Sequence, residues 1–346
     1  MMSDSKRVVF AGILIFGVLL LQPYYLGWLG ISQDDNGDVA LEVISENVPV
    51  EFDAPKKEFY KEKKADHDTL IPKQIYNITT PMFSVEIVNN SGGSIVSSSL
   101  FGLDENDNRL LGGFDENGVY QYDLSVMLAP LDDSYCAPCL SYFDYNKDEY
   151  VYFDMPFQLL TPLSSNNINV RAGDNFTIEF IFEDPSISII KSLVFNSNSY
   201  IIDINYTINN NFVDAQSFEL YWKGGLRPTE SVELEDVTYG YGMVAQGDER
   251  VDINLTSADN IISRTLYNGS VNWVAVRNKY FISALIPTTP SSFATLKASN
   301  ILFADRKITP VYDMSVGYNS TNNISAQLFL GPLDIDYINK LNTNLD

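Results

Sequence analysis

The chain has 346 residues and a formal net charge of −23 at pH 7, with 45 acidic and only 22 basic side chains. Binding to phosphate backbones requires clustered lysine and arginine, so this composition argues against a nucleic-acid partner. The length suffices for a full hydrophobic core, and the many tyrosines (21) and phenylalanines (20) favour β-strands.

Residues 8–31, VVFAGILIFGVLLLQPYYLGWLGI, form an uncharged apolar segment. As a helix this segment would extend about 36 Å, enough to cross a hydrocarbon core of about 30 Å. Lys6 and Arg7 precede it and aspartates follow it, so the positive-inside rule predicts a cytoplasmic start at residues 1–7 and places the rest of the chain across the membrane. A cleaved signal peptide is the alternative, and it predicts the same compartment for the rest. No A-x-A cleavage site follows, which favours a retained transmembrane anchor.

Residues 32–72 are polar, charged and aperiodic, which predicts a flexible tether. The only histidine, His67, lies in this tether. A Ser-His-Asp or Cys-His site needs a base held rigidly beside its nucleophile, so His67 is interpreted as a solvated side chain and not as a catalytic one.

The pattern changes near residue 73, and short runs rich in β-branched and aromatic residues then alternate with Asn, Gly, Asp and Ser clusters. The predicted strands are FSVEIV (83–88), SIVSSSL (94–100), FTIEFIF (176–182), SIIKSLVF (188–195), YIIDINYTI (200–208), SFELYW (217–222), SVELEDVTY (231–239), ATLKASNILF (294–303) and SAQLFLG (325–331). Many short antiparallel strands with few helical segments predict a mainly β fold of two packed sheets over residues 73–346.

The segment VNWVAVRNKYFISALIP (271–287) predicts a hairpin that is covered on both faces. Its apolar side chains occupy both alternation phases, whereas a half-exposed strand would alternate apolar and polar residues. We therefore expect this hairpin in the middle of a sheet.

The end of the chain predicts a short amphipathic helix over residues 333–342, with Pro332 in its first turn. One helical stripe carries four apolar side chains, Leu333, Tyr337, Ile338 and Leu341. Two roles fit the stripe: contact with a partner or a connecting segment, and a cap on one face of a sheet. The sequence leaves both open.

Cys136 and Cys139 form a C-A-P-C motif. A zinc site usually needs four Cys or His ligands, and the chain offers only the distant His67 in addition. A thioredoxin-type pair needs a helix N-terminus beside a βαβ unit, which the flanking residues do not suggest. A local disulfide or a free pair in a loop remains, and an extracytoplasmic location permits the disulfide. We predict no catalytic, cofactor-binding or metal-binding residue elsewhere.

After the predicted anchor and tether, four segments follow in order along the chain: IYNITTPMFSVEIVNNSGGSIVSSSL (75–100), PFQLLTP (156–162), NWVAVRNKYFISALIP (272–287) and LFLGPLDIDYINKL (328–341). In this order, together with the anchor, they resemble the YidC membrane-protein insertases of bacteria with two membranes. Each is similar to a segment of the first helix or large periplasmic domain of that family, and the resemblance extends over nearly the whole chain.

The resemblance implies an antiparallel β-supersandwich of the mutarotase-like type, located in the periplasm and anchored in the inner membrane. It implies a chaperone-like role in membrane-protein insertion, with nascent membrane proteins and the Sec translocon as partners. In this family the inserting groove belongs to a later membrane core of five helices. No second apolar span is present here, so no groove residue is assigned and we expect the chain to be the N-terminal part of a longer protein. The alternative is a membrane-anchored carbohydrate-binding or mutarotase-like sandwich protein.

Overall fold

The computed structural model describes residues 71–101, 110–115, 117–128, 136–144, 148–210, 217–319, 322–341 and 343. The chain divides into two compact units, residues 1–48 and 49–346, and all described residues belong to the second. The predicted anchor and nearly all of the predicted tether, His67 included, lie outside the described residues. Within the described part, no helix has the length and apolar character to cross a bilayer.

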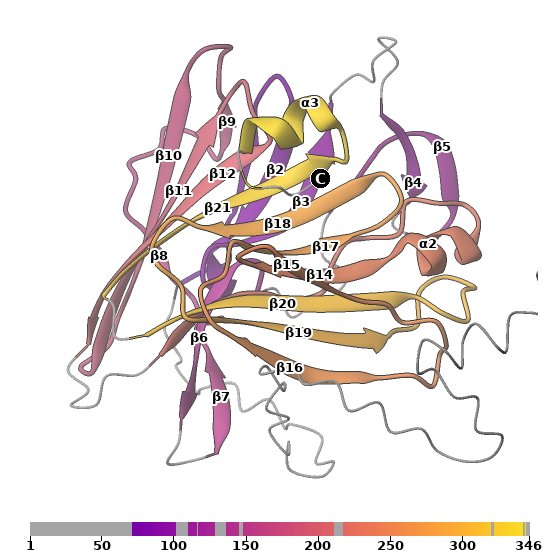
Figure 1. Cartoon of the computed structure of the whole chain (residues 1–346). Helices are drawn as coiled ribbons and strands as arrows, with labels where there is room; N and C mark the ends of the chain where they lie inside the picture. Colours follow the sequence, from indigo (N-terminus) through magenta and orange to yellow (C-terminus); the bar gives the residue numbers. More distant parts are fainter. Residues whose placement is uncertain are drawn as a thin grey trace, which may run out of the picture. The chain divides into compact units, whose positions relative to one another are not determined.

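A nine-stranded sheet runs through the whole body (Figure 1). In sheet order its strands are β15 (Glu249–Ile253), β14 (Tyr241–Gln246), β17 (Trp273–Arg277), β18 (Phe281–Pro287), β21 (Asn323–Pro332), β12 (Ile201–Asn210), β11 (Ile187–Asn196), β10 (Asn175–Glu183) and β8 (Gln158–Leu159).

Three smaller sheets accompany it. The six-stranded sheet has the order β16 (Ile262–Asn268), β19 (Phe293–Asn300), β20 (Pro310–Tyr318), β13 (Phe218–Trp222), β6 (Cys139–Asp144) and β7 (Glu149–Tyr152). The four-stranded sheet has the order β3 (Ser94–Leu100), β2 (Phe83–Val88), β1 (Ile75–Thr79) and β9 (Asn167–Asn169), and β4 (Leu111–Phe114) pairs with β5 (Tyr120–Ser125). The helical elements are η1 (Asn89–Ser91), α2 (Glu233–Tyr239), α3 (Ile335–Ile338) and η2 (Asn339–Leu341).

The six-stranded sheet and the four-stranded sheet pack against different halves of the nine-stranded sheet. Strands β19 and β20 contact β14, β17 and β18, so the six-stranded sheet backs that half. The four-stranded sheet backs the half around β10 to β12, where the Phe83 ring packs against Phe195 and Tyr200. One apolar core runs through both layers. The fold is therefore mainly β and sandwich-like with a short C-terminal helix, as predicted.

The predicted doubly covered hairpin is confirmed. Strands β17 and β18 pair with each other and lie between β14 and β21, in the interior of the nine-stranded sheet. Apart from their last residues, both strands have every side chain buried. Strand β20 contacts both of them, and the Trp273 Nε1–H donates to the carbonyl of Thr343, beyond the terminal helix.

The strand predicted at residues 231–239 is wrong, because most of this segment forms helix α2. Val232 and Leu234 produced the alternating pattern, yet both side chains are exposed and no strand face buries them. Three acidic side chains in the first turn of α2 favour a helix, because they interact well with the partial positive charge of a helix N-terminus.

The terminal helix begins later than predicted. Pro332 is not in its first turn but ends strand β21, where it pairs with Phe281. The chain stays extended to Asp334, whose side chain accepts from the N–H of Asp336 and caps the helix. The helical segment is α3 followed by the 3-10 turn η2, from Ile335 to Leu341.

Candidate functional site

Helix α2 is fixed at one end of the body by a buried ion pair. Arg306 Nη1 lies 2.7 Å from an Asp236 carboxylate oxygen, and both side chains are about 5% exposed. The backbone N–H groups of Thr229 and Glu230 also donate to Asp236, at 3.4 and 3.3 Å. Burial raises the pKa of Asp236, and Arg306 opposes that rise by favouring the charged form. The Arg306 guanidinium also lies 4.7 Å from the centre of the Phe114 ring on β4.

A second group of charges joins α2 to the turn between β17 and β18. Lys279 Nζ lies 3.0 Å from the Glu235 carboxylate and 3.7 Å from that of Glu230. Two effects raise the pKa of Glu230 to about 7: burial is the larger, and a hydrogen bond with Glu235 is the next. Glu230 therefore changes charge near neutral pH, in contact with the only cation of this group.

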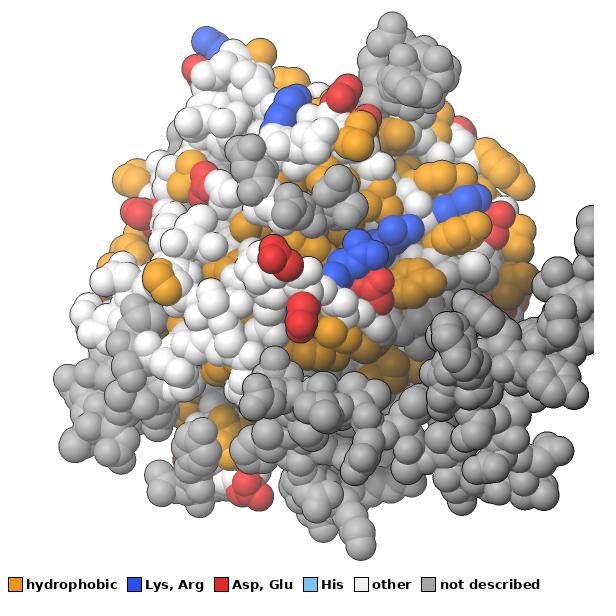
Figure 2. Space-filling model, viewed as in Figure 1, with side chains coloured by type: hydrophobic (Ala, Val, Ile, Leu, Met, Phe, Trp, Pro, Cys, Tyr) orange, Lys and Arg blue, Asp and Glu red, His pale blue; other side chains and the backbone are white. Residues whose placement is uncertain are grey.

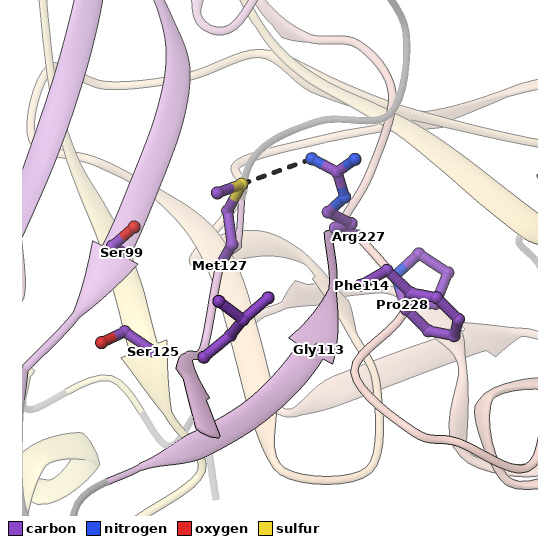
Figure 3. A pocket seen from close by; sticks show the side chains of 8 residues that line it. Ser99, Gly113, Phe114, Ser125, Met127, Arg227 and Pro228 are labelled. Carbon is purple, nitrogen blue, oxygen red and sulfur yellow. Dashed lines mark hydrogen bonds between the residues drawn. The ribbon is translucent and has the colours of Figure 1, made fainter. Parts of the chain in front are cut away.

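A pocket of about 260 Å³ lies against the β4–β5 hairpin, which contributes four of its lining residues. It is lined by Ser99, Gly113, Phe114, Leu124, Ser125, Met127, Arg227 and Pro228 (Figure 3). Arg227 Nη1 donates to the sulfur of Met127 at 3.3 Å. A second cavity of about 20 Å³ shares Arg227 and Pro228 with the first.

The chemistry of this pocket suits an apolar group next to an anion or a carbonyl. Its lining combines aliphatic, aromatic and thioether surface with one guanidinium, and none of the eight side chains is a carboxylate. No group of three or more His, Cys, Asp or Glu side chains in the described part of the chain is arranged to hold a metal ion.

The four predicted stripe residues all pack against the body, although Leu333 lies in the extended segment before the helix. Ile338 and Leu341 are buried, and Leu333 and Tyr337 are half-buried against the main core. The Tyr337 ring lies 4.9 Å from the Tyr200 ring, edge to face. The opposite side of the helix is exposed and carries Ile335, Asp336, Asn339 and Lys340. A partner contact by the stripe itself stays a prediction.

Cys136 and Cys139 form a disulfide. Of the readings that the sequence left open, the local disulfide is the one observed. Both cysteines are buried against Tyr221, with Tyr152 packed beside them. Cys139 is the first residue of β6, so the disulfide closes the C-A-P-C loop at the start of this strand of the six-stranded sheet.

A buried lysine that was not predicted from the sequence connects this loop to the rest of the body. Lys191 on β11 is 0% exposed, and its ammonium donates to three backbone carbonyls, those of Gly93 (2.6 Å), Pro138 (2.7 Å) and Gly92 (3.0 Å). Burial lowers its pKa to about 7. The signal in the sequence was a lone lysine in the apolar run SIIKSLVF.

The two glycines that face Lys191 have to be glycines. Gly92 and Gly93 both have positive φ, 62° and 64°, which suits a residue without a side chain. A Cβ on Gly92 would also lie 2.3 Å from the carbonyl oxygen of Phe153. The segment NNSGGS (89–94) therefore presents two carbonyls to the lysine.

The β4–β5 hairpin was also missed, although its turn has a recognisable signature. In Asp115-Glu-Asn-Gly118 the Asp115 side chain accepts from the N–H groups of Asn117 and Val119, both at 2.9 Å. An Asp and Asn-Gly sequence between apolar residues is typical of such turns.

Comparison with known proteins gives one family. The model of the YidC periplasmic domain matches residues 162–346, which include the β17–β18 hairpin and the terminal helix. Curated relatives bear the name membrane protein insertase YidC. The relative from Hahella chejuensis is 24% identical over 334 residues, covering 91% of this chain and 54% of the relative. That from Prosthecochloris aestuarii is 22% identical over 191 residues, covering 54% of this chain and 32% of the relative.

Solved structures with a similar arrangement are more distant. A galactose mutarotase related enzyme from Lactobacillus acidophilus is 12% identical with a TM-score of 0.41, covering 74% of this chain and 97% of that one. The Slr1438 protein from Synechocystis is 9% identical with a TM-score of 0.43, covering 75% of this chain and 96% of that one. Similarity at this distance carries no information about activity.

The matched region extends over more than half of the chain, and it contains the hairpin and terminal-helix segments on which the sequence resemblance depended. The chain spans about a third of the first curated relative and about half of the one from Hahella chejuensis. This chain therefore belongs to the YidC periplasmic domain family.

Proposed function

We propose that this chain is the membrane-anchored periplasmic part of a membrane-protein insertase, and that it serves as a docking and positioning module without bond-making chemistry of its own. The observation that carries the proposal is family membership over residues 162–346, together with curated relatives named as insertases. The apolar segment at 8–31 is the predicted anchor, and its charged flanks support a periplasmic location of the body in an inner-membrane protein.

The body has the properties of a rigid spacer that holds surfaces for partner contact in place. Its core is continuous across the packed sheets, so the sandwich holds its outer segments in fixed relative positions. The partners that the family implies are nascent membrane proteins and the Sec translocon.

The terminal helix is the coupling element in this proposal. Its stripe holds the helix on the body, and its exposed side is free to contact membrane helices or the translocon. Ile335 is 60% exposed on that side, an apolar side chain that no part of the described body covers.

The coupling role is tested by two matched variants in an insertion assay with a membrane-protein client. Ile335→Asp changes only the exposed side, so it should lower insertion without lowering the melting temperature. Leu341→Asp places a charge against the core, so it should lower both. Unchanged insertion by stable Ile335→Asp protein would refute coupling through this side of the helix.

The larger proposal has a simpler test. The gene downstream of the codon for Asp346 should encode five further apolar spans, which is the membrane core of an insertase. Periplasmic cross-links from the body to Sec components should also form in cells. A stop codon directly after this sequence, with no such cross-links, would instead favour an independent anchored protein.

A further inference from the structure

Four segments meet at one end of the body: the β4–β5 hairpin, the β19–β20 loop, helix α2 and the β17–β18 turn (Figure 1). Three contacts join them in series. The Phe114 ring lies 5.1 Å from the Phe303 ring. The Ile308 N–H donates to the Glu233 carboxylate at 3.0 Å, and Lys279 Nζ lies 3.0 Å from the Glu235 carboxylate. These segments therefore form one continuous surface.

Each of the four segments exposes a large apolar side chain by more than half. We call Tyr122, Leu302, Leu234 and Tyr280 the apolar tips; they are 78%, 92%, 69% and 51% exposed. In Figure 2 hydrophobic side chains lie among charged ones over the side of the body that carries α2 and the β4–β5 hairpin. A single exposed leucine is ordinary on a protein surface, but one on each of four adjoining segments is a shared property of this end.

The acidic side chains of α2 are engaged within the body. Glu233 accepts from the N–H groups of Lys307 and Ile308, Glu235 binds Lys279, and Asp236 is buried with Arg306. Their charge is thus partly compensated at the base of the tips, which lowers the cost of bringing this end to an apolar phase.

We propose that this end of the body contacts the bilayer surface, with the apolar tips among the headgroups of zwitterionic lipids. The proposal rests on the proposed function, because the predicted anchor keeps the body at the membrane. A flexible linker of 41 residues, the length of the predicted tether (32–72), has a root-mean-square reach of about 35 Å. The bilayer is then present at high effective concentration, and weak contacts suffice to orient the body.

The chemistry of the tips favours lipid over a protein partner. Stable protein interfaces bury about 800 Å² per partner in closely packed patches, whereas these side chains project singly from four separate elements of the chain. Tyrosine at 122 and 280 suits the aromatic belt of a membrane interface. The net charge of −23 excludes attraction to anionic lipid as the driving force.

The test places an environment-sensitive nitrobenzoxadiazole probe on Leu302→Cys, on Leu234→Cys and, as control, on Leu160→Cys. Leu160 is exposed beside β8, at one edge of the nine-stranded sheet. The full chain is reconstituted into phosphatidylcholine and phosphatidylethanolamine vesicles that contain a lipid spin-labelled near the headgroup. We expect quenching several-fold stronger at 302 and 234 than at 160, and no increase when anionic phosphatidylglycerol is added.

Two further measurements separate the possible failures. With the probe on Tyr122→Cys, adding Leu302→Ser and Leu234→Ser should reduce quenching several-fold, and both substitutions are at exposed positions that leave the core intact. Equal quenching at 302 and 160 overturns the proposal. A blue-shifted emission from the probe at 302 without quenching by the labelled lipid also overturns it, because that result means that a protein surface covers this end. Alkaline extraction of the same vesicles tests the anchor. If the chain is retained in the vesicles but the probes on the tips are not quenched, the lipid contact alone is rejected. If the chain is released, the anchored topology is rejected as well.

Discussion

Replacing Lys191 with methionine should change how stability depends on pH. The ammonium is fully buried, and its pKa is lowered to about 7 by burial. Because an exposed lysine has a pKa near 10.4, the unfolded chain binds this proton more strongly than the folded one between about pH 7 and 10.5. The free energy of unfolding therefore rises with pH in this window, by up to about 1.4 kcal/mol per pH unit from this group.

The substitution removes that contribution and also leaves three carbonyls, of Gly92, Gly93 and Pro138, without their donor. Each carbonyl left unpaired costs about 1–3 kcal/mol, so Lys191→Met should be the less stable protein even at pH 7.5. The difference between wild type and variant should then grow by about 2–3 kcal/mol between pH 7.5 and 9.5. Tyr206, whose ring centre lies 5.7 Å from the ammonium, does not confound this window because burial raises its pKa well above 10.

Urea unfolding of the full chain in detergent, followed through the fluorescence of the buried Trp222 and Trp273, provides the measurement. Lys191→Arg is the control, since arginine stays charged throughout. A wild-type-minus-Met difference that is flat from pH 7.5 to 9.5 would mean that Lys191 is charged in the folded protein at all these pH values, and the reasoning from burial would be refuted.

Three other changes follow from the charged and covalent contacts. Glu230→Gln should become progressively more stable than wild type in thermal melts from pH 5 to 8, because a raised carboxyl pKa makes the folded wild type lose stability as pH rises through its range; a constant difference would contradict this. Arg306→Met leaves Asp236 as an unpaired buried charge and should cost about 3–5 kcal/mol in urea unfolding, while adding Asp236→Asn should recover part of that loss. Replacing Cys136 and Cys139 with serine should cost about 2 kcal/mol by loop-closure entropy, and the reduced wild type should match the variant.

Local patterns in the sequence were sufficient for the central strands. The hairpin at 271–287 was predicted because both of its alternation phases are apolar, and buried neighbours on both faces demand this. The terminal stripe was predicted by helical spacing alone, and all four of its side chains contact the core.

Features set by distant partners could not be predicted in this way. Pro332 stays extended because it pairs with Phe281, more than 50 residues earlier, and no local pattern encodes that pairing. Arg306 and Asp236 are separated by 70 residues, so the ion pair that secures α2 exists only in the fold. Strand β20, buried at all but its first residue, was also missed, because its polar residues Asp313 and Ser315 bond within the six-stranded sheet and interrupt the apolar pattern.

The side of the membrane on which the body lies is the most direct test of the account. Val251→Cys places a thiol at an exposed position on the edge strand β15, Ser5→Cys places one in the predicted cytoplasmic start, and the native cysteines are protected in their disulfide. In cells with a permeabilised outer membrane, an impermeant maleimide should label the thiol at 251 at once and the thiol at 5 only after the inner membrane is broken. The reverse order of labelling would contradict an anchored periplasmic module.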